Sequence, residues 1–126
     1  MKNNKSKIFA NNIRANSLRM VSAANSSHIG SCLSVADILA VLFSNILKIF
    51  PKDPKNLNRD RLIFSKGHAS AIYYASLAES GFFNINKLKK FCKNNSDLFG
   101  HVTKNNIPGV EFSTGSLGHG LPVASG

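Results

Sequence analysis

The 126-residue sequence lacks the residues that mark several large protein classes. It has no tryptophan, two cysteines and four prolines. Cys32 and Cys92 lie far apart in unrelated contexts, so they predict no disulfide framework and no paired metal site, and they indicate a reducing compartment. No uninterrupted apolar run approaches the roughly 18 residues of a membrane span. The polar start over 1–7 lacks the apolar segment of a secretion signal, so we expect a cytoplasmic protein without a membrane-spanning segment.

Acidic residues are scarce as well, because six Asp and Glu stand against sixteen Lys and Arg, and the net charge is +10. Such a charge suits a nucleic acid, an anionic membrane surface or a phosphorylated substrate. Most of the cations fall in three separate groups, and Asp53 and Asp60 interrupt one of them. This spread favours a solvated basic surface over a nucleic-acid groove. The shortage of acids and the absence of a Gly-x-Ser-x-Gly motif leave little for two-carboxylate or serine hydrolysis.

Hydrophobic spacing predicts several helices in a single domain, in a sequence that is 43% hydrophobic. Apolar residues at near-helical spacing predict four helices, over about 6–25, 35–50, 69–81 and 84–92. Ser34, followed by Asp37 three places later, predicts the N-cap of the second helix. That helix is apolar on nearly every face, so we expect it to be buried on several sides.

One β-strand is predicted over 61–65, where a short apolar run is bounded by polar groups. A parallel strand needs neighbours on both sides to pair its backbone groups. We therefore expect an α/β fold in which residues 1–126 are the helix-rich first part of a parallel-sheet domain. In this interpretation residues 1–12 are a polar N-terminal extension, and the domain is incomplete at Gly126.

All four histidines lie in loops beside glycine or serine, at His28, His68, His101 and His119. Each alone is compatible with an ordinary loop residue, but four such settings indicate a ligand site, because glycine lets the backbone approach a ligand closely. Their spacing matches no zinc motif. His68 has the best-defined setting. It follows the predicted strand, where ligands gather in parallel sheets, and precedes a helix start that favours an anion such as phosphate.

A long aperiodic stretch covers 93–117, which is typical of a binding loop or of disorder. It leads into the glycine-rich turn 115–120, which matches neither GxGxxG nor the Walker motif. Imidazoles, amides and glycines therefore dominate the chemical inventory. Such a set suits a phosphorylated, carbonyl-bearing molecule whose bond-breaking chemistry belongs to a cofactor.

Several blocks together resemble the N-terminal region of transketolases, in that family's order and spacing over roughly residues 13–126. The blocks are Met20–Gly30 (MVSAANSSHIG), Leu33–Leu39 (LSVADIL), Asp60–Ala69 (DRLIFSKGHA), Phe99–His101 (FGH), Pro108–Glu111 (PGVE) and Ser113–Gly118 (STGSLG). Ile29 stands where single-chain transketolases tend to have proline. The sequence is therefore more similar to the separately encoded N-terminal sections of split transketolases.

The resemblance implies a thiamine diphosphate-binding domain, and with it the transfer of a two-carbon ketol unit from a ketose phosphate to an aldose phosphate, as in pentose phosphate metabolism. It implies catalytic roles for His28, near the reacting carbonyl and hydroxyl, and for His101, at the hydroxyl end of the donor. His68 matches the family histidine beside the cofactor diphosphate. The segment against the aminopyrimidine is matched by Gly115, Ser116 and Leu117.

Two positions depart from the family pattern, since His119 stands where glutamine is usual and Val102 where proline is frequent. The Gly-Asp-Gly motif and the asparagine that complete the family's Mg²⁺ site would follow Gly126, so the resemblance implies no metal ligand within these residues. It also implies a C-terminal transketolase section as partner and a homo- or hetero-oligomer. No role for a nucleic acid or a membrane is expected.

Three hypotheses remain. The first is the N-terminal portion of a split-type transketolase, inactive as 126 residues alone. The second is a catalytically inactive remnant of a truncated gene. The third is a basic nucleic-acid-binding module, which predicts salt-sensitive binding but has neither a groove-reading helix nor an aromatic stacking surface to support it.

Overall fold

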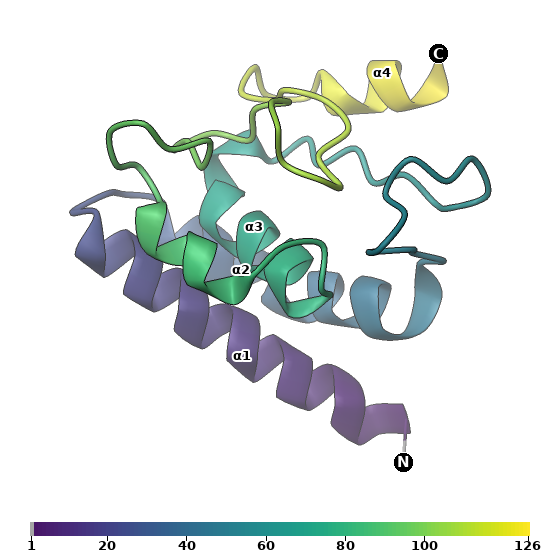
Figure 1. Cartoon of the computed structure of the whole chain (residues 1–126), viewed down its shortest axis with the longest axis horizontal. Helices are drawn as coiled ribbons and strands as arrows, with labels where there is room; N and C mark the ends of the chain where they lie inside the picture. Colours follow the sequence, from purple (N-terminus) through teal and green to yellow (C-terminus); the bar gives the residue numbers. More distant parts are fainter. Residues whose placement is uncertain (1) are drawn as a thin grey trace.

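The computed structural model describes the chain from Lys2 to Gly126, with side chains from Asn4 onward. In that part, the α-helices are α1 (Lys2–Ala23), α2 (Ile29–Val41), α3 (Ser70–Glu79) and α4 (Gly120–Ser125). Shorter pieces are the π-helical η1 (Leu42–Ile46), which continues α2, and the 3-10 turns η2 (Gly67–Ala69) and η3 (Ile85–Lys90). Figure 1 shows α3 packed on α1 and α2, with loops and α4 on the far side of α3 from α1.

The first predicted helix is confirmed as α1, although it starts at Lys2 rather than near residue 6. Residues 2–12, which we expected to be a polar extension, form the first half of this helix. Phe9 in this half stacks on Phe43 of η1, with 6.3 Å between the ring centroids, and Ala10 beside it is buried. The first half of α1 therefore packs on the end of the second helix.

The second helix starts at Ile29, so the predicted N-cap at Ser34 is wrong. His28 precedes the helix in a left-handed backbone conformation, with φ of 73°. This conformation turns the chain sharply and lets the helix begin earlier than the pattern indicated. Ser34 lies inside the helix, where its hydroxyl donates to the Ser31 carbonyl at 3.1 Å. Serine makes such local bonds both in helices and at caps, so the pattern alone does not distinguish the two.

Within the described residues, α2 buries one face only. Small and apolar side chains pack against α1 and α3, namely Cys32, Ala36, Leu39 and Ala40. The opposite face carries large apolar side chains that are exposed, namely Leu33, Ile38 and Val41, continued by Ile46 of η1. We call these four residues the α2 outer face. Ile38 is 61% exposed, so the expectation of burial on several sides is wrong for this part of the chain.

The continuous helix from Ile29 to Ile46 is long and apolar enough to cross a membrane, by length and composition only. Its 18 residues have a mean hydropathy of 1.8, and 28% of them are buried. The mostly buried core helix of a soluble protein meets the same criterion, and α2 packs on α1 and α3 with one face. The lack of an uninterrupted apolar run therefore did not suffice to exclude a membrane span. The absence of a membrane-spanning segment stays a prediction.

No β-strand is assigned in residues 2–126, so the parallel sheet is not confirmed. The predicted strand over 61–65 is an extended segment. It is held mainly by isolated bonds, such as the one from the Thr114 hydroxyl to the Phe64 carbonyl at 2.7 Å. Nearby, the Val102 N–H donates to the Gly67 carbonyl at 3.0 Å, and the Thr114 N–H donates to the Val102 carbonyl at 2.9 Å. Three segments thus lie side by side without the regular ladder that defines a sheet.

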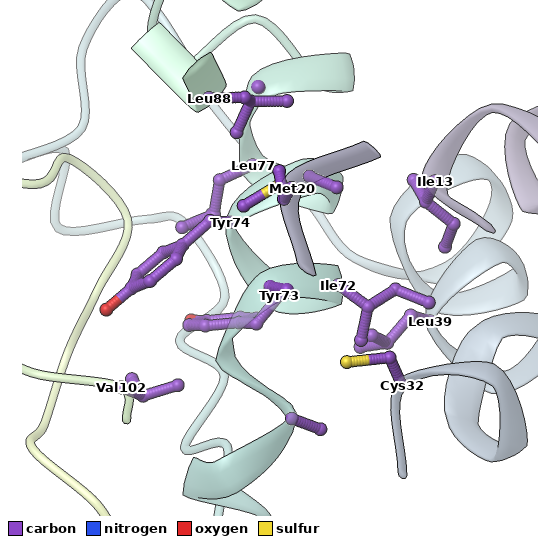
Figure 2. Packing of buried hydrophobic residues seen from close by; sticks show 14 of the residues in the cluster. Ile13, Met20, Cys32, Leu39, Ile72, Tyr73, Tyr74, Leu77, Leu88 and Val102 are labelled. Carbon is purple, nitrogen blue, oxygen red and sulfur yellow. The ribbon is translucent and has the colours of Figure 1, made fainter. Parts of the chain in front are cut away.

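The core is centred on α3, in which every residue from Ser70 to Ala78 is buried. Figure 2 shows Ile72 on the side of α3 that faces Leu39, whereas Tyr73 and Tyr74 point the other way. The two tyrosines thus face the loops that follow the helix. This division places apolar packing on one side of α3 and phenol hydroxyls on the side that carries the long loop.

The two later predicted helices are also found. The one over 69–81 corresponds to η2 and α3, and Gly81 follows with φ of 88°, as a glycine that ends a helix does. The one over 84–92 is the 3-10 turn η3, which Asn84 caps by accepting from the Asn86 N–H at 2.9 Å. Between η3 and α4 no regular element is assigned, which agrees with the predicted long loop.

Candidate functional site

Three of the four histidines meet at one place. The ring centroids of His28 and His68 are 5.4 Å apart, and those of His28 and His101 are 5.6 Å apart, both pairs in an edge-on arrangement. The rings come from the start of α2, from η2 and from the long loop. The structure therefore brings together three imidazoles that the sequence places far apart. Their individual roles stay predictions.

A cavity of about 230 Å³ lies at the three imidazoles. It is lined by Ser26, Ser27, His28, Cys32, His68, Ala71, Phe91, Gly100 and His101. The Ser26 hydroxyl is buried and has no hydrogen-bond partner among the described residues. Because an unpaired buried hydroxyl costs about 1–3 kcal/mol, this hydroxyl needs a partner that the described residues do not supply.

Lys66 ties the turn that carries His68 to α2. Its Nζ donates to the Ser31 carbonyl at 3.0 Å and to the Ser34 hydroxyl at 2.7 Å. His28 directly precedes α2, and His68 follows Lys66 by one intervening residue. The bridge therefore fixes the positions of the two imidazoles relative to each other.

Hydroxyl groups of α3 hold the backbone around His101. The Ser70 hydroxyl donates to the Gly100 carbonyl at 2.8 Å, and the Tyr74 hydroxyl donates to the His101 carbonyl at 3.2 Å. Burial raises the pKa of Tyr74 to about 12, so the phenol stays protonated and able to donate. On the other side of His101, the Val102 N–H donates to the first residue of η2. The loop is thus fixed on both sides of the imidazole.

The turn before His68 approaches the predicted aminopyrimidine segment closely. A Cβ atom on Gly67 would lie 2.4 Å from the Thr114 carbonyl oxygen, so a larger residue would push the two segments apart. The next residue, Gly115, lies beside His101, because a Cβ atom on it would be 3.7 Å from that ring. The structure therefore brings Gly115 to the histidine cluster.

The rest of the glycine-rich turn lies further out. Ser116 and Leu117 follow Gly115 with exposed side chains, and Leu117 is 76% exposed. His119 does not join the cluster, because its ring nitrogens face the carbonyls of Ser113 and Ser116 and its ring packs on a phenylalanine. His119 therefore closes the turn, whereas Ser116 and Leu117 remain open to a ligand.

The lining of the site suits an anion, since its residues include three imidazoles, which can donate N–H hydrogen bonds, and no acid that would repel it. Burial lowers the pKa of His68, and the neighbouring His28, Lys66 and His101 lower it further. Burial raises the pKa of the Cys32 thiol, so this cysteine stays protonated and unreactive at the cavity wall. In residues 2–126, no group of three His, Cys, Asp or Glu side chains is placed to hold a metal ion.

Sequence reasoning missed the residues that support the histidines. Ser26 and Cys32 line the cavity, and Ser70 and Tyr74 hold the His101 loop. One signal was available, because Ser70 and Tyr74 are four residues apart and therefore share one face of a helix. Without the structure, nothing indicated that this face meets residues 100–101.

Residues 5–126 match the family model described as "Transketolase, thiamine diphosphate binding domain". The chain belongs to the transketolase family. The human transketolase is 45% identical over 118 residues, which are 93% of this chain and 19% of that protein. Transketolase 2 of Escherichia coli is 44% identical over 121 residues, which are 95% of this chain and 18% of that protein.

A further relative is named as one subunit of a transketolase. This apulose-4-phosphate transketolase subunit from Actinobacillus succinogenes is 46% identical over 99 residues, which are 79% of this chain and 36% of that protein. The chain therefore spans about a fifth to a third of the length of these curated relatives.

Solved transketolases share the fold of this chain. The transketolase of Leishmania mexicana superposes with a TM-score of 0.86 at 35% identity, over 92% of this chain and 18% of that one. The transketolase of Campylobacter jejuni superposes with a TM-score of 0.81 at 47% identity, over 89% of this chain and 18% of that one. The helix-rich architecture is thus that of the matching region of transketolases.

Proposed function

We propose that this chain is the N-terminal portion of a transketolase subunit. With thiamine diphosphate, the whole enzyme transfers a two-carbon ketol unit from a ketose phosphate to an aldose phosphate, as a cytoplasmic enzyme of carbohydrate metabolism. The observation that carries the proposal is the meeting of His28, His68 and His101 at one cavity, in a chain that matches the thiamine diphosphate-binding domain.

The residues present fit this cofactor. The cavity offers an unpartnered buried hydroxyl at Ser26 and a lining without acids, which suits a diphosphate. His68 would contact the diphosphate, and the aminopyrimidine would be held by Gly115, Ser116 and Leu117. Thiamine diphosphate supplies, when bound, the nucleophilic carbon and the electron sink for cleaving a carbon–carbon bond. The ligands for its Mg²⁺ are expected outside these residues.

The imidazoles would handle protons and orient the sugar. An imidazole exchanges protons with a hydroxyl near neutral pH, so His28, which touches both other rings, would take and return the proton of a substrate hydroxyl. His101 would hold the hydroxyl end of the donor by a hydrogen bond. The lowered pKa of His68 keeps this ring neutral at pH 7, so it can donate one N–H to a phosphate oxygen without adding charge to the site.

We propose that the partner of this chain is a C-terminal transketolase section, in a homo- or hetero-oligomer that acts on sugar phosphates. The likeness to a relative that is named as one subunit of a transketolase supports a separately encoded section. The α2 outer face supports further packing, because four large apolar side chains are exposed on one helix there and such exposure is typical of an interface.

A chimera tests the proposal. Residues 5–126 replace the matching segment of Escherichia coli transketolase 2, and two-carbon transfer between sugar phosphates is assayed with thiamine diphosphate. We expect transfer, and we expect His28→Asn, which removes the proton-transfer group, to lower kcat by about 10²–10⁴-fold. His101→Asn removes one hydrogen bond of about 0.5–1.5 kcal/mol and should lower kcat/KM by about twofold to tenfold. His119→Gln is the matched control, because that ring stands apart from the cavity and glutamine is usual in the family at this position, and it should change kcat by only a few-fold. A chimera that binds the cofactor yet loses nothing with His28→Asn contradicts the assigned role.

The inactive-remnant alternative makes a different prediction. It expects a genuine stop codon after Gly126, whereas the proposed function expects an in-frame Gly-Asp-Gly further downstream. It also expects no binding of thiamine diphosphate in calorimetry. The third hypothesis, a nucleic-acid-binding module, expects salt-dependent binding of generic DNA or RNA by the 126-residue chain.

A further inference from the structure

A second hollow, of about 480 Å³, lies between the C-terminal half of α1 and η3. Apolar side chains form its floor, namely Met20, Leu88 and Phe91, and cations stand among its lining residues, namely Arg19, Lys89 and Lys93. We call it the α1–η3 pocket. Figure 2 shows Met20 and Leu88 together near Leu77 at one end of α3, well away from Val102. The pocket therefore combines an apolar floor with a positively charged rim.

The rim cations are available to an anion. Arg19, Lys89 and Lys93 are exposed, and among the described residues none of them forms an ion pair. The neighbouring Lys87 differs, because its Nζ lies 3.2 Å from a carboxylate oxygen of Asp97. None of the residues that line the pocket is acidic.

One acid lies behind the pocket wall. Glu79 accepts from the Asn16 side chain at 2.8 Å and from Asn12 at 3.3 Å. Its carboxylate is therefore engaged with amides on α1 and does not contact the rim cations. The net field at the opening is positive, and it favours a negatively charged group.

The size of the pocket suits a small molecule. Ligand pockets hold roughly 300–1,000 Å³, and the volume of about 480 Å³ lies within that range. We propose that the α1–η3 pocket binds a small amphiphilic anion, with an apolar body on the floor and one anionic head among Arg19, Lys89 and Lys93. This site is separate from the proposed thiamine diphosphate site.

Phe91 places this pocket next to the histidine cavity. Its buried ring lines both hollows and lies 6.4 Å, between centroids, from Tyr74, whose hydroxyl holds the His101 carbonyl. An occupant of the α1–η3 pocket would touch one face of Phe91. Its binding is therefore expected to shift the NMR signals of Phe91 and Tyr74, and those of His119 should stay unchanged.

The test uses octanoate as probe and the full 126-residue chain. Binding is followed by NMR chemical shifts at increasing octanoate, with octanamide as the uncharged probe of the same shape. We expect saturable binding of octanoate, centred on Met20, Leu88 and Phe91, and weaker binding of octanamide. Replacing Arg19 or Lys89 by Gln should in each case weaken octanoate binding by about 1.5-fold to fivefold, which is the contribution of an exposed ion pair. Added salt should also weaken octanoate binding, because it screens the charges.

Two isoleucine variants separate the pocket from the other exposed apolar surface. Ile85 lines the pocket and is 44% exposed, and Ile38 on the α2 outer face is 61% exposed. Ile85→Glu places an acid at the rim and removes an apolar contact, so it should weaken octanoate binding more than the loss of either cation does, whereas Ile38→Glu should leave it unchanged. Circular dichroism checks that both variants keep their helices. The proposal is overturned if wild type does not bind octanoate, if octanamide binds equally well, or if Ile38→Glu weakens binding as much as Ile85→Glu.

Discussion

The most informative perturbation is the removal of one oxygen atom, by Tyr74→Phe. The Tyr74 hydroxyl donates to the His101 carbonyl at 3.2 Å and accepts from the Thr103 N–H at 3.4 Å. A typical intramolecular hydrogen bond contributes about 0.5–1.5 kcal/mol. Both bonds here are long, and His101 is exposed, so water can replace part of the loss. We therefore expect the free energy of unfolding to fall by about 1 kcal/mol, or Tm by about 4 °C.

Tyr73→Phe is the matched control for this change. Tyr73 is the preceding residue of α3, is equally buried, and its hydroxyl donates to the Gly109 carbonyl at 3.0 Å, away from the histidines. Urea unfolding of dilute protein should show a similar loss for both variants. NMR signals of the His28 and His101 rings should move in Tyr74→Phe only. Equal movement in both variants, or none in Tyr74→Phe, would refute the idea that this hydroxyl positions the His101 loop.

Further predictions concern backbone, charge and surface. Gly67→Ala should lower the free energy of unfolding by about 2–3 kcal/mol, because the added Cβ atom would collide with the backbone of Thr114. Gly30→Ala, inside α2, should instead raise it by up to about 1 kcal/mol in the same urea assay, because the added Cβ atom meets nothing within 4 Å. Burial and the neighbouring groups lower the pKa of His68 in the folded chain, so as pH falls the histidine is protonated in the unfolded chain before it is protonated in the folded one. The Tm should therefore fall as pH drops below about 6.5. His68→Asn should make this fall smaller in thermal melts. Ser26→Ala should leave stability unchanged or raised while weakening thiamine diphosphate binding in the chimera; a marked loss of stability would show that the hydroxyl already has a partner. The α2 outer face should drive self-association of the 126-residue chain at high concentration, and Ile38→Glu should reduce it in sedimentation; an unchanged profile would assign the association to another surface.

Helix positions were predictable because they depend on local spacing. The pattern located α1 and α3, and the predicted helix over 84–92 falls on the 3-10 turn η3. The start of α2 was not predictable, since it depends on a left-handed conformation at His28, which a residue other than glycine adopts only when its surroundings hold it there. The pairing of the segment over 61–65 is decided by neighbours distant in sequence, and no local signal reports whether they are present.

The histidines of the candidate site were more predictable than the side chains that hold them in place. The glycine or serine beside each histidine marked His28, His68 and His101, and their meeting is observed. His119 has the same local setting but bonds to its own turn instead. Adjacency to glycine therefore indicates where an imidazole could approach a ligand, and tertiary contacts decide which one does.

The supporting groups explain why a helix read as core matters to the chemistry. In α3 the apolar period fixes Ile72 toward the other helices, and this orientation necessarily turns Ser70 and Tyr74 toward the long loop. A loop without regular structure has few internal bonds to fix it, so the carbonyls on either side of an imidazole need donors from a rigid element. The hydroxyls of α3 supply them at residues 100 and 101. One side of α3 therefore packs the core, and the other side positions the loop that carries His101. A substitution on the loop-facing side should disturb the site while lowering the free energy of unfolding no more than a typical core substitution does.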